Sequence, residues 1–361
     1  MLSLLIPTYN EKENIPELLE RIQKTLQSSE YEVIVVDDNS PDETWKVAEG
    51  FSKRFSEIRL IRRLGKLGLS SAFLDGLKAS KGELVGLIDS DLQHPPEVLT
   101  KMLDEISSGA DLVVASRYVR GGGVSNWPRS RQVISRGARL LANILLPKVR
   151  AVKDPMSGYF IIRRKSIEGI QLYPRSFKIL LEILVKGNYR KVVEVPYIFE
   201  TRKHGKSKLG TEEIWNYLKH LLRLVKETKS YLRVFRFIAV GLIGVVVNES
   251  ILWFMTARVG FFYLFSAIIG TELAIVNNFV WNDLWTFDDM IRDRTVKSTF
   301  SRFLKFNISM VGGTAISLAV LWALTTLFGL NYLFSNLFAI GVAMLWNYLV
   351  SITFVWGFTP H

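Results

Sequence analysis

Four apolar stretches in the C-terminal part of the chain limit what it can fold into. Each is long enough to cross a lipid bilayer as an α-helix, and they run roughly over residues 234–257, 261–282, 303–328 and 332–356. The links 258–260 and 329–331 are very short, so each pair of neighbouring spans should form a hairpin. The sequence therefore predicts an α-helical transmembrane domain of four spans over residues 233–361.

Basic residues predict how these spans are oriented. The link between the second and third spans carries Arg292, Arg294, Lys297 and Arg302, and the segment before the first span carries Lys226, Lys229, Arg233 and Arg236. Because basic loops stay in the cytosol, we expect a multi-pass protein of the cell membrane whose N-terminal domain and C-terminus are cytosolic. The N-terminus has no basic segment before a long apolar run, so it does not resemble a signal peptide.

The membrane part repeats itself at a spacing of 69 residues. The matches include polar and small residues as well as apolar ones: Arg233 with Arg302, Gly244 with Gly313, and Asn278 with Asn347. Each repeat is one hairpin that enters and leaves on the same side, so we expect two parallel repeats. The pattern resembles the four-span GtrA-like domains associated with polyprenol-linked sugars.

Two carboxylates, Glu249 and Glu272, lie inside spans of the first repeat only. A carboxylate in the apolar part of a bilayer is costly, so a functional role is the usual expectation. A protonated carboxyl group, or one bonded to a neighbouring helix, would explain them equally well.

The N-terminal part alternates between strand and helix patterns. Short apolar runs predict buried strands at 2–6, 31–36, 58–61, 84–88 and 111–115. The segments between them predict helices at 11–27, 42–55, 69–79 and 95–107. This alternation is typical of an α/β domain with a mainly parallel, Rossmann-like sheet, which we expect over residues 1–210. Ligands bind such sheets at the carboxyl ends of the strands.

Polar residues follow three of the predicted strands directly. The three segments are Pro7-Thr8-Tyr9-Asn10-Glu11, Asp37-Asp38-Asn39-Ser40 and Asp89-Ser90-Asp91-Leu92-Gln93. Ser40 is also a candidate N-cap for the helix at 42–55. The first segment is not a Gly-rich dinucleotide loop, which argues against a dehydrogenase. Asp89 and Asp91 end an apolar strand, where two carboxylates can share one hard cation.

Composition excludes several other classes of protein. The chain contains no cysteine and four scattered histidines, so it has no disulfide, no thiolate nucleophile and no zinc-ligand spacing. Its net charge of +12 could suit nucleic acid, but no recognition motif for nucleic acid is present. A basic domain joined to apolar spans indicates an anionic membrane surface or anionic substrates instead.

Taken together, the strand-end segments resemble the inverting GT-A glycosyltransferases of family 2, and within them the dolichyl-phosphate mannose synthases. Three further segments support the resemblance: Ala115-Ser116-Arg117-Tyr118, Asp154-Pro155-Met156-Ser157-Gly158-Tyr159-Phe160 and Arg202-Lys203-His204-Gly205-Lys206-Ser207-Lys208. The chain lacks the Gln-x-x-Arg-Trp motif of processive polysaccharide synthases and has 177–182 in its place, so no long polymer is expected.

The resemblance implies the roles of individual residues. The nucleotide sugar, expected to be GDP-mannose, would contact Pro7, Tyr9, Glu11, Val36, Asp38, Asp89, Ser90, Asp91, Gln93, Lys178, Arg202 and Lys208. Mg²⁺ or Mn²⁺ would be held by Asp89, Asp91 and Gln93. The phosphate of a polyprenyl (dolichyl) acceptor would be held by Arg117, Arg131, Ser135 and Arg202. Asp89, Asp91, Arg117 and Arg202 would act directly in catalysis.

Two amphipathic segments should place this domain at the bilayer surface. Residues 127–146 mix arginines with leucines, and residues 211–232 lead into the first span. The sequence thus predicts a metal-dependent transfer of mannose to dolichyl phosphate at the cytosolic membrane face. Two alternatives remain open. One is a polyprenyl-phosphate glucosyltransferase that uses UDP-glucose, and the other is a flippase of lipid-linked sugars with a nucleotide-sensing domain.

Overall fold

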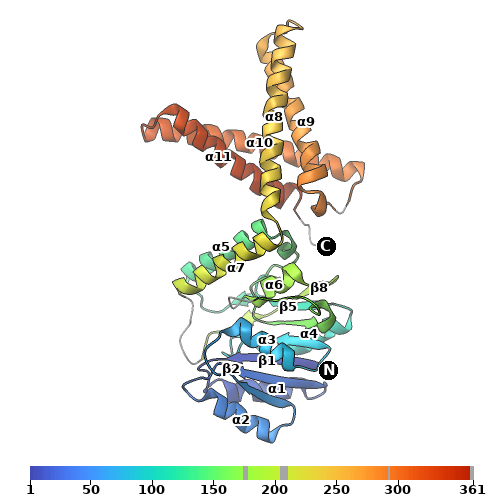
Figure 1. The fold of residues 1–361 in the computed structure, drawn as a ribbon, viewed down its shortest axis with the longest axis vertical. Helices are drawn as coiled ribbons and strands as arrows, with labels where there is room; N and C mark the ends of the chain where they lie inside the picture. The colour runs from blue at the N-terminus through green and yellow to red at the C-terminus, as the bar shows by residue number, and fades with distance from the viewer. Residues whose placement is uncertain (174–177, 204–209, 292, 358–361) are drawn as a thin grey trace. The chain divides into compact units, whose positions relative to one another are not determined.

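The computed structural model describes residues 1–173, 178–203, 210–291 and 293–357 (Figure 1). The chain divides into two compact units, Met1–Thr228 and Lys229–His361. The first unit contains the α/β domain and the second contains the apolar helices, so the two kinds of sequence pattern correspond to separate bodies.

A seven-stranded sheet forms the centre of the first unit. Its order is β3-β2-β1-β4-β7-β5-β8, and the strands are β1 (Leu2–Thr8), β2 (Tyr31–Asp37), β3 (Ile58–Arg62), β4 (Leu84–Leu87), β5 (Leu112–Ser116), β7 (Phe160–Arg163) and β8 (Val192–Pro196). Neighbours pair in parallel except around β7, which is antiparallel to both β4 and β5. Two short strands, β6 (Gly123–Val124) and β9 (Ile198–Phe199), pair separately. The mainly parallel sheet predicted from the sequence is confirmed.

Helices cover both faces of this sheet because alternate strand residues point to opposite sides. The helices are α1 (Ile15–Leu26), α2 (Thr44–Arg54), α3 (Leu69–Ala79), α4 (Val98–Ser107), α5 (Arg129–Leu145), α6 (Ile179–Lys186) and α7 (Thr211–Glu227). Helices α1, α2 and α4 contribute to the core on one face. Helices α3, α5, α6 and α7 contribute to the core on the other. Buried Leu221 and Leu224 therefore place α7 within the first unit.

The start of α2 differs from the sequence prediction. Ser40 does not cap this helix, which begins at Thr44. The Ser40 hydroxyl donates instead to Asp37 at 2.6 Å, and the N–H of Thr44 donates to the side chain of Asp42 at 3.0 Å. Ser40 belongs to the turn that follows β2, because its hydroxyl donates to the charged carboxylate of Asp37. The N–H groups at the start of the helix therefore do not use Ser40 as their acceptor.

Among its described residues, the second unit contains four helices that are long and apolar enough to cross a membrane. They are α8 (Tyr231–Ala257), α9 (Tyr263–Trp281), α10 (Val296–Trp322) and α11 (Tyr332–Val350), and the last three continue into π-helical segments, η3 (Asn282–Thr286), η5 (Ala323–Leu327) and η6 (Ser351–Val355). Helix α10 begins seven residues before the predicted span at 303, because its first two turns are polar and Thr295 caps them by accepting the N–H of Ser298.

The internal repeat is visible in the packing of the two hairpins. A Cβ atom on Gly244 would overlap the side-chain amide of Asn278, and one on Gly313 would overlap that of Asn347. Each helix pair therefore approaches closely at the same place, with a glycine facing an asparagine. The glycine and asparagine matches found in the sequence reflect one packing arrangement used twice.

An aromatic stack joins the equivalent ends of the two repeats. Phe287 and Trp356 occupy matching positions and stack on each other, with ring centroids 4.5 Å apart. Phe237 packs on Phe287 at 6.2 Å, and its counterpart Phe306 packs on Trp356 at 5.6 Å. Equivalent side chains of the two repeats therefore contact each other, and each is flanked by the equivalent phenylalanine of its own repeat.

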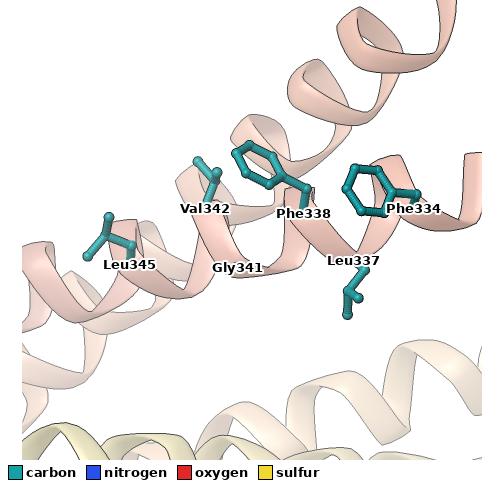
Figure 2. A pocket seen from close by; sticks show the side chains of 6 residues that line it. All are labelled: Phe334, Leu337, Phe338, Gly341, Val342 and Leu345. Atoms are coloured by element: carbon teal, nitrogen blue, oxygen red, sulfur yellow. The ribbon is translucent and has the colours of Figure 1, made fainter. Parts of the chain in front are cut away.

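The outer surfaces of the two hairpins differ. Glu249 and Glu272 are exposed on the first hairpin, where the second has Leu318 and Gly341. Gly341 lies in an apolar groove along α11 that is lined by Phe334, Leu337, Phe338, Val342 and Leu345 (Figure 2). The carboxylates are therefore not needed for the hairpin fold itself.

Candidate active site

Asp89 and Asp91 follow β4 at the carboxyl edge of the sheet, as the sequence predicted. Burial and the nearby charge of Asp91 raise the pKa of Asp89 well above its ordinary value, and the cations of Lys178 and Arg117 oppose this. Within the described residues, Oδ1 of Asp89 is buried and has no hydrogen-bond partner. Such a group is costly unless a ligand satisfies it.

Two neighbours shape the position of the Asp89 carboxylate. The backbone of Gly158 lies so close that a Cβ there would be 2.5 Å from Oδ2 of Asp89. His94 is buried, with Nδ1 3.6 Å from the same oxygen. Burial, together with the charges of Arg117 and Lys178, lowers the pKa of His94 to about 3, so its imidazole is neutral.

The donor set fits a divalent cation. Two mutually repelling carboxylates with an unsatisfied oxygen are what Mg²⁺ or Mn²⁺ would relieve. In the described part of the chain, no group of three or more His, Asp or Glu side chains gathers around them. Gln93 is turned toward the backbone, because its side-chain nitrogen donates to the carbonyl of Glu200 at 2.9 Å. Asp89 and Asp91 would therefore hold a metal together with ligands from the substrate.

Arg202, which follows β9, is far along the chain from the other residues of the site but lies beside them in the structure. It donates to Oε1 of Glu11 at 2.5 Å, and the same nitrogen lies 3.6 Å from Oδ2 of Asp91. Asn14 donates to the second oxygen of Glu11 at 2.6 Å. The loop after β1, the loop after β4 and the chain after β9 are therefore joined by charge at one point.

Arg117 is buried and paired. Its guanidinium makes two parallel hydrogen bonds of 2.7 Å each to the carboxylate of Asp154. Burial would lower the pKa of Arg117, but the bonds and charge of Asp154 outweigh this and raise it. Lys178 lies nearby, where burial and the charge of Arg117 lower its pKa to about 8. These two cations face the region of Asp89, whose charge acts on both.

Helix α5 contributes the remaining predicted residues. Arg131 lies over the ring of Trp127 at 4.3 Å, and burial, with the charge of Arg117, lowers its pKa. Asp91 opposes that shift, so the guanidinium is within electrostatic reach of the carboxylate pair. Ser135, one turn further along, shares a hydrogen bond of 2.9 Å with the hydroxyl of Tyr118.

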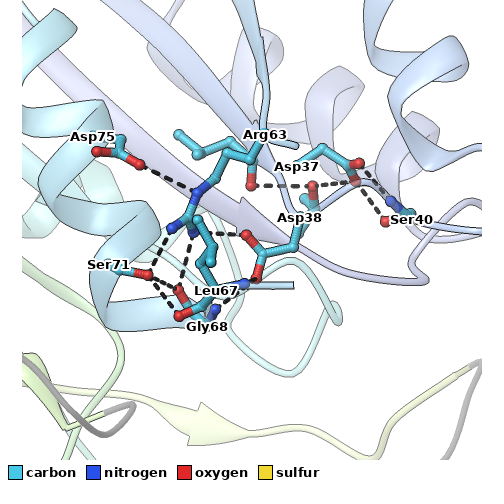
Figure 3. A network of polar contacts seen from close by, with 10 residues as sticks. Asp37, Asp38, Ser40, Arg63, Leu67, Gly68, Ser71 and Asp75 are labelled. Atoms are coloured by element: carbon cyan, nitrogen blue, oxygen red, sulfur yellow. Dashed lines mark hydrogen bonds and ion pairs between the residues drawn. The ribbon is translucent and has the colours of Figure 1, made fainter. Parts of the chain in front are cut away.

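Some of the predicted nucleotide contacts lie at the carboxyl edge of the sheet, and others do not. Tyr9 and Asp38 follow β1 and β2 at the carboxyl edge, and the hydroxyl of Ser90 donates to the carbonyl of Pro7 at 3.0 Å. The side chain of Val36 is fully buried in the core, so a nucleotide contact predicted at this residue would have to involve its backbone. The Asp38 carboxylate binds Arg63 and backbone N–H groups (Figure 3). Lys208 lies outside the described residues.

Sequence reasoning missed the residues that support these groups. Asp154, Arg63 and Gly158 contact predicted site residues from 25 to 69 positions away along the chain. Asp154 and Gly158 stand in a segment that carried the family resemblance, so a signal for them was present. Nothing in the sequence marked Arg63, because its role depends on which strands become neighbours.

The sheet, its paired strand-end carboxylates and the surrounding arginines define a glycosyltransferase domain, here joined to a four-helix membrane domain. Residues 3–170 match the family described as "Glycosyl transferase family 2", and residues 236–356 match "GtrA/DPMS, transmembrane domain". The chain belongs to glycosyltransferase family 2, among the dolichol-phosphate mannosyltransferases.

One named relative supports this assignment over nearly the whole length of the chain. A dolichol-phosphate mannosyltransferase of Pyrococcus furiosus is 45% identical over 355 residues, covering 98% of this chain and 99% of the relative. The Saccharomyces cerevisiae dolichol-phosphate mannosyltransferase is 35% identical over 264 residues, covering 70% and 94%. Among solved structures, glucosyl-3-phosphoglycerate synthase from Mycobacterium tuberculosis, in complex with Mn²⁺, UDP-glucose and phosphoglyceric acid, is similar at 20% identity and a TM-score of 0.47 over 62% of this chain and 78% of that one.

Proposed function

We propose that the protein transfers mannose, with inversion, from GDP-mannose to a polyprenyl (dolichyl) phosphate at the cytosolic membrane face, which gives dolichyl-phosphate mannose. The observation that carries the proposal is that a pair of carboxylates and a group of cationic side chains lie in one site. Asp89 and Asp91, expected to face the donor together with Lys178, lie within electrostatic reach of Arg117 and Arg131, which are expected to face the acceptor. The names of the relatives support mannose as the transferred sugar and dolichyl phosphate as the acceptor.

On the donor side, Asp89 and Asp91 would hold Mg²⁺ or Mn²⁺ against the diphosphate. The metal would neutralise charge on the leaving group. Gly158 leaves room for Asp89 and His94 packs beside it, so the carboxylate is already oriented before the donor binds. Arg202, held by Glu11, adds a positive charge beside Asp91.

On the acceptor side, the nucleophile would be a phosphate monoester. Its second pKa is about 6, so it is already anionic at neutral pH and needs no strong general base. What the site must supply is positive charge that brings two polyanions together. Arg117, Arg131 and Lys178 provide it from three different elements, and the buried neutral His94 is not required as a base.

A lipid acceptor also requires the site to lie near the bilayer. Helices α5 and α7 carry large apolar side chains on exposed positions, namely Val133, Leu140, Trp215 and Leu222. Exposed residues of this size on amphipathic helices are typical of segments that lie in the membrane interface. We infer that both helices rest on the cytosolic leaflet and bring the acceptor phosphate to Arg131.

A transfer assay tests this function directly. Radiolabelled GDP-mannose and UDP-glucose would each be offered with a polyprenyl phosphate to the detergent-solubilised full chain. We expect label to enter the lipid from GDP-mannose only, with the opposite anomeric configuration from the donor. Label entering the lipid from UDP-glucose instead would reject the proposed donor, and no labelled lipid from either would reject the transferase proposal.

Variants on α5 test the acceptor side. Arg131→Ala and Ser135→Ala should raise the KM for polyprenyl phosphate and leave nucleotide affinity nearly unchanged. Arg129→Ala is the matched control, because Arg129 is exposed on the same helix two residues earlier. Loss of nucleotide affinity, or normal use of the lipid by both variants, would place the acceptor phosphate elsewhere.

A further inference from the structure

Glu194 is a carboxylate on the core side of an edge strand. It lies on β8, the last strand of the sheet, opposite Val114 of β5. Val114 is fully buried in the core to which α5 and α6 contribute. Since opposite residues of neighbouring strands point to the same face of a sheet, Glu194 points toward that core, and it is half-buried there. A carboxylate in such a place is costly unless hydrogen bonds satisfy it.

Two successive backbone N–H groups satisfy this carboxylate. Oε2 of Glu194 accepts the N–H of Lys153 at 2.8 Å, and Oε1 accepts the N–H of Asp154 at 3.0 Å. Each oxygen therefore has its own donor, and bonds to a charged acceptor are stronger than neutral ones. Glu194 thus fixes the main chain at the start of segment 153–158, which follows the short helix η1 (Pro147–Ala151).

The residue that Glu194 holds is the partner of Arg117. The buried carboxylate of Asp154 accepts two bonds of 2.7 Å from the guanidinium of Arg117 and also the backbone N–H of Arg117 at 3.0 Å. Asp154 therefore fixes both the main chain and the side chain of Arg117. Two carboxylates act in series: Glu194 holds the backbone of Asp154, and the side chain of Asp154 holds Arg117.

The rest of segment 153–158 contacts two further charged groups of the site. The carbonyl of Met156 accepts a bond from Nζ of Lys178 at 3.5 Å. The backbone of Gly158 lies directly against the carboxylate of Asp89. Both contacts are further along the segment than the two N–H groups that Glu194 binds. A shift of the main chain there would therefore act first on Arg117.

We propose that Glu194 is a positioning residue for the transfer reaction, which holds the main chain of Asp154 and thereby orients the guanidinium of Arg117. Glu194 itself contacts neither substrate. The inference rests on the proposed function in that it takes Arg117 to act on the acceptor phosphate. It adds to the site a residue of the edge strand β8, which the strand-end segments of the sequence did not include.

Glu194→Gln should change kcat rather than the KM for the acceptor. Glutamine keeps the size of the side chain, but its amide nitrogen is a donor and cannot accept the second backbone N–H. A guanidinium that is held less firmly still attracts a phosphate, so acceptor binding should not weaken. It is no longer aligned in the transition state, where a displacement of about 1 Å costs about 10²-fold. We therefore expect kcat to fall about tenfold or more, with an acceptor KM no higher than that of the wild type.

A double variant tests the route through Arg117. Arg117→Lys keeps the positive charge beside Asp154 but cannot make the two parallel bonds of a guanidinium. If Glu194 acts through Arg117, adding Glu194→Gln to Arg117→Lys should change kcat by less than about twofold, because residues that act in series are not additive. A further fall of about tenfold in the double variant would overturn the inference, since Glu194 would then act on another group.

Asp111 offers a matched control on the same two strands. Its Oδ2 accepts the backbone N–H groups of Arg190 at 2.9 Å and of Lys191 at 3.3 Å, at the amino ends of β5 and β8. Asp111→Asn therefore removes a carboxylate that binds two successive N–H groups, but at the edge of the sheet opposite the site. It should lower Tm and leave kcat unchanged. A loss of kcat as large as that of Glu194→Gln would overturn the inference, because the loss would then follow from stability alone.

The measurements use the full chain in detergent, with GDP-mannose and a polyprenyl phosphate as substrates. Titration calorimetry with farnesyl phosphate, and with GDP and Mg²⁺, shows whether Glu194→Gln is folded, since both affinities should stay within about twofold of the wild type. A raised acceptor KM with normal kcat, or lost GDP binding, would overturn the inference. If the wild type uses UDP-glucose instead, the proposed donor fails, but the same comparison of kcat with UDP-glucose still tests Glu194.

Discussion

Glu182 provides a quantitative test of how the first unit is held together. Its side chain is fully buried on α6. It accepts the N–H of Tyr173 at 3.0 Å and bonds of 2.6 Å from both Lys186 and Arg223, and His220 lies 3.5 Å away. Arg223 and His220 belong to α7, so this carboxylate links α7 to the core. The perturbation is Glu182→Gln, which keeps the size of the side chain and removes its charge.

The pKa of Glu182 gives the magnitude. Burial alone would raise the pKa, but hydrogen bonds from His220, Lys186 and Tyr173 outweigh it and lower the pKa from 4.5 to about 2. A depressed folded-state pKa contributes stability above the unfolded-state value, and this contribution is lost as the pH falls toward the folded-state value. The difference corresponds to about 3 kcal/mol near neutral pH and to less than half of that near about pH 3.

Thermal unfolding of the full chain in detergent measures the effect. For a domain of this size, about 3 kcal/mol corresponds to a fall in Tm of roughly 6–12 °C near neutral pH. The fall should shrink steadily as the pH is lowered below 4.5, because the wild-type carboxylate also becomes protonated in the unfolded state. Glu49→Gln, in an exposed pair with Lys53, should leave Tm unchanged. A difference that is absent at neutral pH, or that grows in acid, would refute the reasoning.

Three further predictions concern the site and the membrane part. Asp91→Asn, or EDTA with the wild type, should abolish transfer and should remove the Mg²⁺-dependent part of GDP binding in calorimetry; full activity in EDTA would reject the metal. Gly158→Ala should lower kcat by about 10²-fold through displacement of Asp89, with little change in Tm. Cysteines placed at Ser298 and at Asn331 should react with a membrane-impermeant reagent from opposite sides of sealed vesicles, whereas labelling from one side would contradict the two-hairpin topology.

Much of the fold could be predicted because its signals are local. Apolar runs such as 31–36 and 111–115 became β2 and β5 almost residue for residue, since a buried strand must be continuously apolar. Strand β7, only four residues long, was not predicted. Its antiparallel place between β4 and β5 depends on pairing across the sheet, which no local pattern encodes.

The candidate site also has a part that local sequence signals predict and a part that depends on long-range contacts. Asp89 and Asp91 could be found because the ends of parallel strands meet at one edge. The contacts that decide what each group can do are long-range: Arg63 beside Asp38, and Asp154 beside Arg117. Resemblance supplied residue types at matched positions, but it could not say that the side chain of Val36 would face the core.

The two arginines around Trp127 show why those long-range contacts matter for function. Arg117 and Arg131 lie 5.3 Å and 4.3 Å from the same indole ring. Arg117 is neutralised by Asp154, whereas Arg131 forms no ion pair with any residue that the structure describes. Burial and the repulsion from Arg117 lower the pKa of Arg131, so its charge is held there at a cost. The negative charge of an incoming phosphate would stabilise the cation of Arg131. At Arg117 the phosphate would have to compete with Asp154. The balance supports Arg131 as the residue that receives the acceptor and Arg117 as a fixed charge behind it.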